Sequence, residues 1–177
     1  GRLRYTPDFR QAMEDAQLVF LAMDTPITSE GVDLGPIWEG VRKIAASARR
    51  DYVLVVSSQV PVGTCEEIER VAAEANVGVR CEVACNPEFL RLGSAVDLFR
   101  RPDRIVIGAR KREVADKVAA VYAPFHRPIL LMSLREAEMV KHATNAYVAN
   151  SGSFMGEISQ LCDALGVTYF CCSSSQH

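Results

Sequence analysis

The sequence predicts an α/β protein with a mostly parallel sheet, followed by one long helix. Short apolar runs alternate with segments of helical periodicity, a pattern typical of parallel sheets covered by helices on both faces. Polar, Pro-bearing loops follow three of these runs. A single helical pattern then extends over about residues 134–165, beyond the usual length of about 8–20 residues for a globular helix.

The first third of the chain predicts helix, strand, turn and helix in that order. A short helix is expected over 8–16, and the apolar run 17–23 is expected to form a buried strand. This strand should end at 24–26, because Pro26 cannot donate a hydrogen bond to a sheet ladder. Residues 27–35 are rich in turn formers, and residues 36–49 carry apolar side chains at helical spacing.

Four further strands and three helices complete the expected order. Strands are predicted at 52–56, 79–84, 104–108 and 129–132, and helices at about 65–75, 111–122 and 134–165. Thr64 and Glu67 predict a capping box at the start of the first of these helices. Gly152 and Gly156 interrupt the last helix, which suggests close approach of another helix.

Three regions are expected along the chain. Residues 1–132 form the α/β region, 133–167 the region of the long helix, and 168–177 an irregular tail without periodicity. The 177 residues are 49% hydrophobic and 24% charged, enough for a packed core.

Charge and cysteine content exclude several classes of protein. The net charge is -2 with dispersed Lys and Arg, so no nucleic-acid surface is expected. No apolar run approaches the roughly 18 residues of a membrane span. The first residues are not expected to be a signal peptide, because no apolar stretch follows their basic residues. The six cysteines lack C-x-x-C spacing, so we expect reduced thiols, no metal site and a cytoplasmic protein.

The polar loops locate a candidate site. Loops 24–28, 57–64 and 86–94 follow strands, and ligands of parallel sheets bind at the carboxyl ends of strands. Lys141 and Asn145 are one helical turn apart and could direct a cation and an amide at a single oxygen, although spacing alone also fits a solvated Lys and an ordinary Asn.

Glu88 is a second candidate of this kind. It follows Pro87 at the end of a predicted strand, where a partly dry cleft would raise the pKa of a carboxyl and make it a base. The alternative is a Glu that caps a turn.

Four segments, in order, resemble the UDP-glucose/GDP-mannose dehydrogenase family. Residues 24–26 are similar to its V-x-T-P loop, and residues 58–64 to its K-S-T-V-P-V-G-T loop. Residues 86–91 match N-P-E-F-L-R and are followed by P-D-R-I-V-I-G at 102–108. Residues 138–146 are similar to E-x-x-K-x-x-x-N-A of the central helix.

The resemblance implies that residues 1–132 are a partial Rossmann-like NAD-binding domain and that residues 133–167 hold the long central and dimerisation helix of a dehydrogenase. It also implies a UDP-sugar substrate. Such enzymes oxidise a sugar C6 alcohol to a carboxylate with two NAD, and the full-length parent is expected to be a homodimer through the central helix. The family's G-x-G-x-x-G and the Gly-rich loop of its nucleophilic Cys do not occur here. We therefore expect a segment of a longer enzyme, inactive alone.

The resemblance also implies residue roles. The expected catalytic residues are Glu88, Lys141, Asn145 and Gln59. The expected cofactor-binding residues are Asp24, Thr25, Pro26, Ser58, Gln59, Val60 and Leu92. The expected substrate-binding residues are Glu88, Phe89, Leu90, Arg91, Lys141 and Asn145. Three positions depart from the family pattern: Ser57 replaces a common Lys, Gln59 a Thr, and Leu92 a Glu.

Other classes stay open at this point. Hydroxyacid and 6-phosphogluconate dehydrogenases also place Lys-x3-Asn on a helix, but N-P-E-F-L-R argues against them. GDP-mannose dehydrogenases share N-P-E-F-L, and dehydrogenases of N-acetylated sugar nucleotides differ around 102–108. A truncated NAD-binding module without activity is the non-enzyme alternative.

Overall fold

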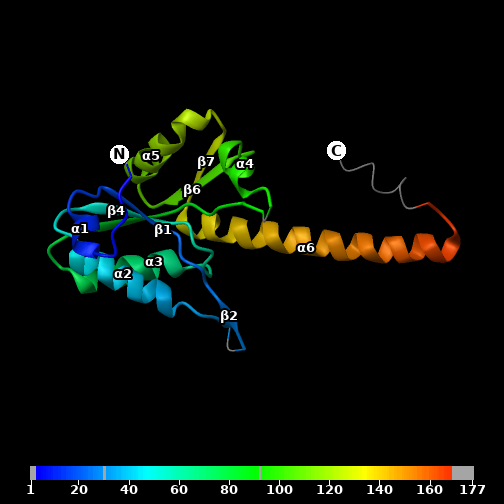
Figure 1. The fold of residues 1–177 in the computed structure, drawn as a ribbon, viewed down its shortest axis with the longest axis horizontal. Coiled ribbons are helices and arrows are strands. Elements are labelled where there is room, and N and C mark those ends of the chain that lie inside the picture. Colours follow the sequence, from blue (N-terminus) through cyan, green and yellow to red (C-terminus); the bar gives the residue numbers. More distant parts are fainter. Residues whose placement is uncertain (1–2, 30, 92, 169–177) are drawn as a thin grey trace. The chain divides into compact units, whose positions relative to one another are not determined.

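A five-stranded sheet in the order β1-β4-β5-β6-β7 forms the centre of the fold in the computed structural model, which describes residues 3–29, 31–91 and 93–168 (Figure 1). Its strands are β1 (Leu18–Leu21), β4 (Tyr52–Val56), β5 (Cys81–Cys85), β6 (Ile105–Ala109) and β7 (Ile129–Met132). The helices are α1 (Phe9–Met13), α2 (Gly35–Ser47), α3 (Thr64–Ala75), α4 (Ala95–Arg100), α5 (Arg112–Tyr122) and α6 (Leu134–Leu165). A short hairpin, β2 (Ile27–Thr28) with β3 (Gly31–Val32), and a 3-10 turn at Ala123–Phe125 complete the order.

The sheet is mostly parallel, as predicted. Strand β4 pairs in parallel with β1 and β5, and β6 pairs in parallel with β7. The exception is β5 with β6, an antiparallel pair that joins only Ala84 to Ala109 and Cys85 to Gly108. Because Gly108 also pairs with Met132 at the end of β7, the reversal brings the start of α6 level with the carboxyl end of β5.

The two faces of the sheet belong to two separate cores. Alternate residues of a strand point to opposite faces, so Leu54 and Val56 pack with α2, α3 and the first turn of α6, while Val53 and Val55 pack with α5. All four side chains are at most 3% exposed. The continuous apolar runs in the sequence reflect this burial on both faces.

Several local predictions need correction. The turn-rich segment 27–35 contains the β2–β3 hairpin, and α4 and the 3-10 turn were not predicted. The predicted capping box at Thr64 is wrong. Gly63 is the N-cap with φ of 96°, and the Thr64 hydroxyl donates to the Pro61 carbonyl at 2.7 Å. Glycine adopts this left-handed conformation without the steric cost of a Cβ.

The packing of the chain defines two compact units, residues 1–141 and 142–177, so the boundary falls inside α6. The predicted limits of the long helix, 134–165, match α6. A Cβ added at Gly152 or Gly156 would meet no described atom within 4 Å. The close approach of another helix at these glycines therefore stays a prediction. The predicted tail lies outside the described residues from residue 169 onward.

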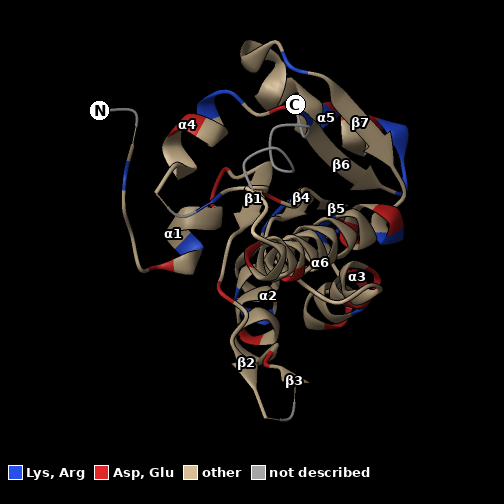
Figure 2. Ribbon diagram, turned by 90° about the vertical axis from the view of Figure 1, so that its right-hand side faces the viewer, with Lys and Arg blue, Asp and Glu red and all other residues tan. Residues whose placement is uncertain are grey.

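Residues of both charges are spread over the described elements, as Figure 2 shows. None of the described helices combines the length and apolar character required to cross a membrane. Within 3–29, 31–91 and 93–168, no group of three or more His, Cys, Asp or Glu could hold a metal ion.

Candidate active site

The loops after β1 and β4 are joined by side-chain hydrogen bonds. The Ser58 hydroxyl accepts from the Met23 amide at 2.8 Å and donates to the Leu21 carbonyl at 3.3 Å. The Thr25 hydroxyl donates to the Gln59 carbonyl at 2.8 Å. The loops after β1 and β4 are therefore held together as one surface at the carboxyl ends of these two strands.

Some of the predicted cofactor-binding residues in these two loops are buried and others are exposed. Ser58 and Val60 are buried, at 8% and 3% exposure, and thus hold the loop in place. Asp24, Pro26 and Gln59 are exposed, and the Asp24 carboxylate accepts from the Thr25 amide at 2.9 Å. Leu92, also predicted to bind cofactor, lies outside the described residues.

The loop after β5 is anchored by a residue that the sequence analysis did not single out. The buried Asn86 continues the pairing of β5 through its amide, which donates to the Val56 carbonyl at 2.9 Å. Its side chain donates to the Val106 carbonyl at 2.8 Å and accepts from the Tyr122 hydroxyl. Burial raises the pKa of Tyr122, which keeps this hydroxyl a donor. A polar Asn directly after an apolar strand was the available signal.

Lys141 and Glu88, two of the predicted site residues, lie close together. The Lys141 ammonium lies 3.6 Å from Glu88 Oε1, while Glu88 Oε2 accepts from the Leu90 amide at 2.5 Å. The Lys141 side chain is 10% exposed and the Glu88 side chain 47% exposed. Glu88 thus lies at a half-open surface of the first unit and not in the partly dry cleft that we expected. Of the two charged side chains, it is Lys141 that is nearly buried.

Phe89 lies near two cations. The Lys141 ammonium is 5.5 Å from the centre of its ring and the Arg104 guanidinium 5.3 Å. Both distances are within the range of cation–π attraction. Leu90 and Arg91 are exposed beside it. Asn145 is one helical turn beyond Lys141 and belongs to the second unit.

A second missed residue, Glu138, is 2% exposed in the second turn of α6. Its two carboxylate oxygens accept from the backbone amides of Gly63 at 2.6 Å and Cys65 at 2.7 Å. These amides start α3, so the positive end of the α3 dipole is matched by a carboxylate of the chain itself. Their donors are therefore not available to a phosphate.

Two cysteines, Cys65 and Cys81, have environments that disfavour the thiolate. The contact with the Cys85 thiol, together with burial, raises the pKa of Cys65. Burial raises the pKa of Cys81 to about 11. A protonated thiol is a weak nucleophile, so both residues are unsuited to covalent catalysis at neutral pH.

A sheet with polar loops at the carboxyl ends of adjacent parallel strands, facing a helix that supplies a buried Lys, defines the class of dinucleotide-dependent dehydrogenases. Residues 1–126 match the UDP-glucose/GDP-mannose dehydrogenase family, NAD binding domain. The chain belongs to this family, and its cofactor is NAD.

Named relatives agree with this assignment. A UDP-glucose 6-dehydrogenase of Pseudomonas aeruginosa is 41% identical over 94% of this chain and 39% of that protein. The structure of a UDP-glucose dehydrogenase from Pyrobaculum islandicum aligns with a TM-score of 0.91 and 38% identity, over 97% of this chain and 41% of that one. A GDP-mannose dehydrogenase from P. aeruginosa aligns with a TM-score of 0.90 and 29% identity, over 96% and 41%. The chain thus spans about two fifths of these relatives.

Proposed function

We propose that this chain is the part of a UDP-glucose 6-dehydrogenase that orients NAD and supplies Lys141, Asn145 and Glu88 to the sugar, in an enzyme that oxidises UDP-glucose to UDP-glucuronate with two NAD. The observation that carries the proposal is the Lys141–Glu88 pair, 3.6 Å apart, beside the loops that follow β4 and β5. Alone, the chain does not turn over.

Lys141 would stabilise negative charge on the substrate. Removing hydrogen from an alcohol leaves partial alkoxide character on the oxygen, and a fixed cation lowers the energy of that state. The Lys141 side chain is only 10% exposed, and a charge near so little water acts more strongly than one at the surface. Asn145, four residues further on the same helix, would add a neutral donor to the same oxygen.

Glu88 would act as a base for water. Its carboxylate is 47% exposed and therefore accessible to a water molecule, while the bond from the Leu90 amide fixes one of its oxygens. In this proposal Glu88 accepts a proton as water attacks a thioester that the substrate forms with a Cys outside this chain. Phe89, Leu90 and Arg91 would lie along the sugar nucleotide.

The described residues fit one side of a nicotinamide cofactor. NAD supplies the hydride acceptor in each oxidation step. Thr25 and Pro26 would shape the groove, Asp24 borders it, and Ser58, Gln59 and Val60 would hold the loop beside the nicotinamide. The hydrogen bond from Thr25 to the Gln59 carbonyl supports this assignment, because it makes the two loops a single wall. The amides at the start of α3 are not part of the site, since Glu138 occupies them.

The sugar nucleotide is UDP-glucose in this proposal because the relatives named UDP-glucose 6-dehydrogenase reach 41% identity, against 29% for the GDP-mannose dehydrogenase. We further propose a cytoplasmic homodimer formed through α6. A Cβ added at Gly152 or Gly156 would meet no described atom within 4 Å, so a second helix could approach α6 closely at these positions.

The Glu88→Gln variant of a full-length protein that contains these residues tests the mechanism. The amide keeps the shape but cannot accept a proton, so early oxidation should proceed while a covalent sugar adduct accumulates. We expect a burst of no more than about two NADH per site, together with the adduct in intact-protein mass spectrometry.

A matched control is Glu82→Gln. Glu82 lies on β5, the strand before the loop that carries Glu88, and its carboxylate binds the Lys111 ammonium at 2.6 Å, away from the site. This variant should turn over normally. Normal turnover of Glu88→Gln without an adduct would show that Glu88 is structural. Substrate binding with neither burst nor adduct would place its action at alcohol oxidation.

A further inference from the structure

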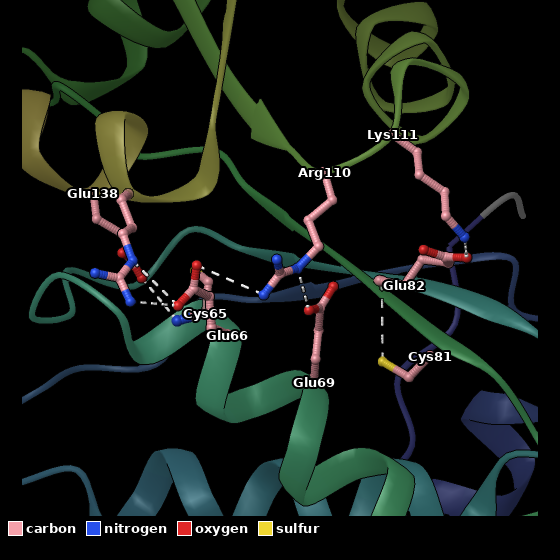
Figure 3. Close-up of polar contacts among 9 residues, drawn as sticks. Cys65, Glu66, Glu69, Cys81, Glu82, Arg110, Lys111 and Glu138 are labelled. Atoms are coloured by element: carbon pink, nitrogen blue, oxygen red, sulfur yellow. Dashed lines mark hydrogen bonds and ion pairs between the residues drawn. The ribbon is translucent and has the colours of Figure 1, made fainter.

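Glu138 joins the second turn of α6 to the start of α3. Figure 3 shows it on α6, directed at the start of α3, where its oxygens accept from the Gly63 and Cys65 amides. Arg135 on the same helix donates to Glu66 of α3 at 2.7 Å, but this pair is exposed, and exposed ion pairs are weak constraints. The buried carboxylate is therefore the firmer attachment between α3 and α6.

Lys141 is three residues beyond Glu138, so the two side chains lie on one face of α6. Both are buried, at 2% and 8% exposure. Rotation of the helix that withdrew Glu138 from α3 would therefore also carry the Lys141 ammonium away from Glu88. The attachment acts at a second place too, because Gly63 ends the loop that carries Gln59 and Val60.

We infer that Glu138 is a positioning residue, whose two hydrogen bonds to the start of α3 set both the direction of Lys141 and the conformation of the 57–63 loop. It contacts neither substrate nor cofactor in this arrangement. The expected effect of Glu138 on catalysis rests on the proposed function. Its effect on the orientation of Lys141 and on the 57–63 loop does not depend on that function.

The two-oxygen geometry makes Glu138→Gln a specific perturbation. A carboxylate offers an acceptor to each amide, whereas the side chain of Gln offers one acceptor and one NH2 donor. One of the Gly63 and Cys65 amides would then face a donor in a buried site. The side-chain volume is almost unchanged, so the core around it need not collapse.

The matched control is Glu136→Gln. Glu136 lies two residues earlier on α6 and also accepts a backbone N–H, that of Ser133 at 2.7 Å, but it caps only its own helix. The readouts on this chain are amide hydrogen exchange at Gly63 and Cys65 and the acylation rate of Lys141 by acetic anhydride. Peptide mass spectrometry measures both.

We expect Glu138→Gln to raise both rates by about tenfold, the factor that corresponds to losing one hydrogen bond to a charged group, and Glu136→Gln to leave them unchanged. Equal rates in the two variants would overturn the inference. If amide exchange in strand β4 shows that the Glu138→Gln protein unfolds, Glu138→Asp takes its place, because its shorter side chain reaches at most one amide. A folded Glu138→Asp protein with faster exchange at Gly63 or Cys65 but an unchanged acylation rate of Lys141 would equally overturn the inference.

Kinetics of the full-length protein separate the two proposals. Glu138→Gln should lower kcat by about tenfold with little change in KM for the nucleotide sugar, since Lys141 acts on the transition state. A wild-type protein without NAD-dependent oxidation would refute the proposed function alone. An active wild type, with a Glu138→Gln variant whose kcat and Lys141 acylation are unchanged, would refute the positioning role alone.

Discussion

The packing of α6 against β6 at Gly108 gives a quantitative prediction. A Cβ at this position would lie 2.6 Å from the Ala137 Cβ and 2.7 Å from the Ser133 carbonyl oxygen. Ordinary contact begins at 3.4 Å, so Gly108→Ala must displace the start of α6 by about 0.8 Å. The neighbours are backbone and a buried Ala, not the flexible end of a side chain, so we expect a loss of about 3 kcal/mol in the free energy of unfolding.

Urea unfolding of this chain, followed by the fluorescence of the single Trp38, measures that loss. Trp38 packs against the core of the first unit and so reports on it. A loss of about 3 kcal/mol corresponds to a fall of roughly 6–12 °C in Tm for a chain of this size. Gly78→Ala is the control, because its Cβ would meet only Asn76 Oδ1, at 3.7 Å, and should leave stability within about 0.5 kcal/mol. A Gly108→Ala variant as stable as this control would refute the steric reasoning.

Three further predictions concern ionisation and catalysis. Burial raises the pKa of Tyr52 and Tyr122 above the ordinary value of about 10, so stability should hold below pH 10 and fall above it, by up to about 1.4 kcal/mol per pH unit and tyrosine. Urea unfolding between pH 9 and 12 measures this dependence. Phe at both positions should reduce the loss of unfolding free energy with rising pH, whereas Phe at the exposed Tyr5 should not change it. In the full-length protein, Lys141→Ala should lower kcat by about 10²–10³ with a smaller effect on substrate binding, and an unchanged kcat with raised KM would indicate a binding role. The 177-residue chain alone should form no NADH from UDP-glucose at micromolar protein, and a steady rate that Lys141→Ala abolishes would contradict this.

The central strands and the long helix were predictable because their signal is local and strong. Strand β4 is buried at every position, so its sequence is an uninterrupted apolar run. The limits of α6 agree with the helical periodicity. By contrast, α4 has only six residues, which is too short for a helical period to show in the sequence, and none of them is buried. The β2–β3 hairpin consists of two-residue strands, too short for a period to show.

The direction of β6 was not predictable from its own residues. An apolar strand buried on both faces reads the same in either direction, and only the path of the connection decides it. The connection between β5 and β6 leaves the two strands antiparallel, paired at Ala84 with Ala109 and at Cys85 with Gly108. This reversal matters for the site, because it starts α6 beside the loops and allows Lys141 to reach Glu88.

The role of Glu138 was hidden for a different reason. Its partners are backbone amides 75 and 73 positions away, which leave no mark in the pattern of side chains. The sequence instead offered Thr64 and Glu67 as a local cap for α3. In the structure a Glu from a distant helix performs this task, and Glu67 pairs with Arg70 on the surface.

The motifs that carry the family resemblance also meet in one set of contacts. Gly108, the last residue of the 102–108 segment, has no Cβ and so admits the start of α6. That helix carries Glu138, which accepts from the Gly63 amide of the 58–64 segment, and Lys141, which approaches Glu88 of the 86–91 segment. A change at Gly108 should therefore reach Lys141 by moving α6, without touching the site itself. The stability loss and the increased acylation of Lys141 should then appear together in Gly108→Ala.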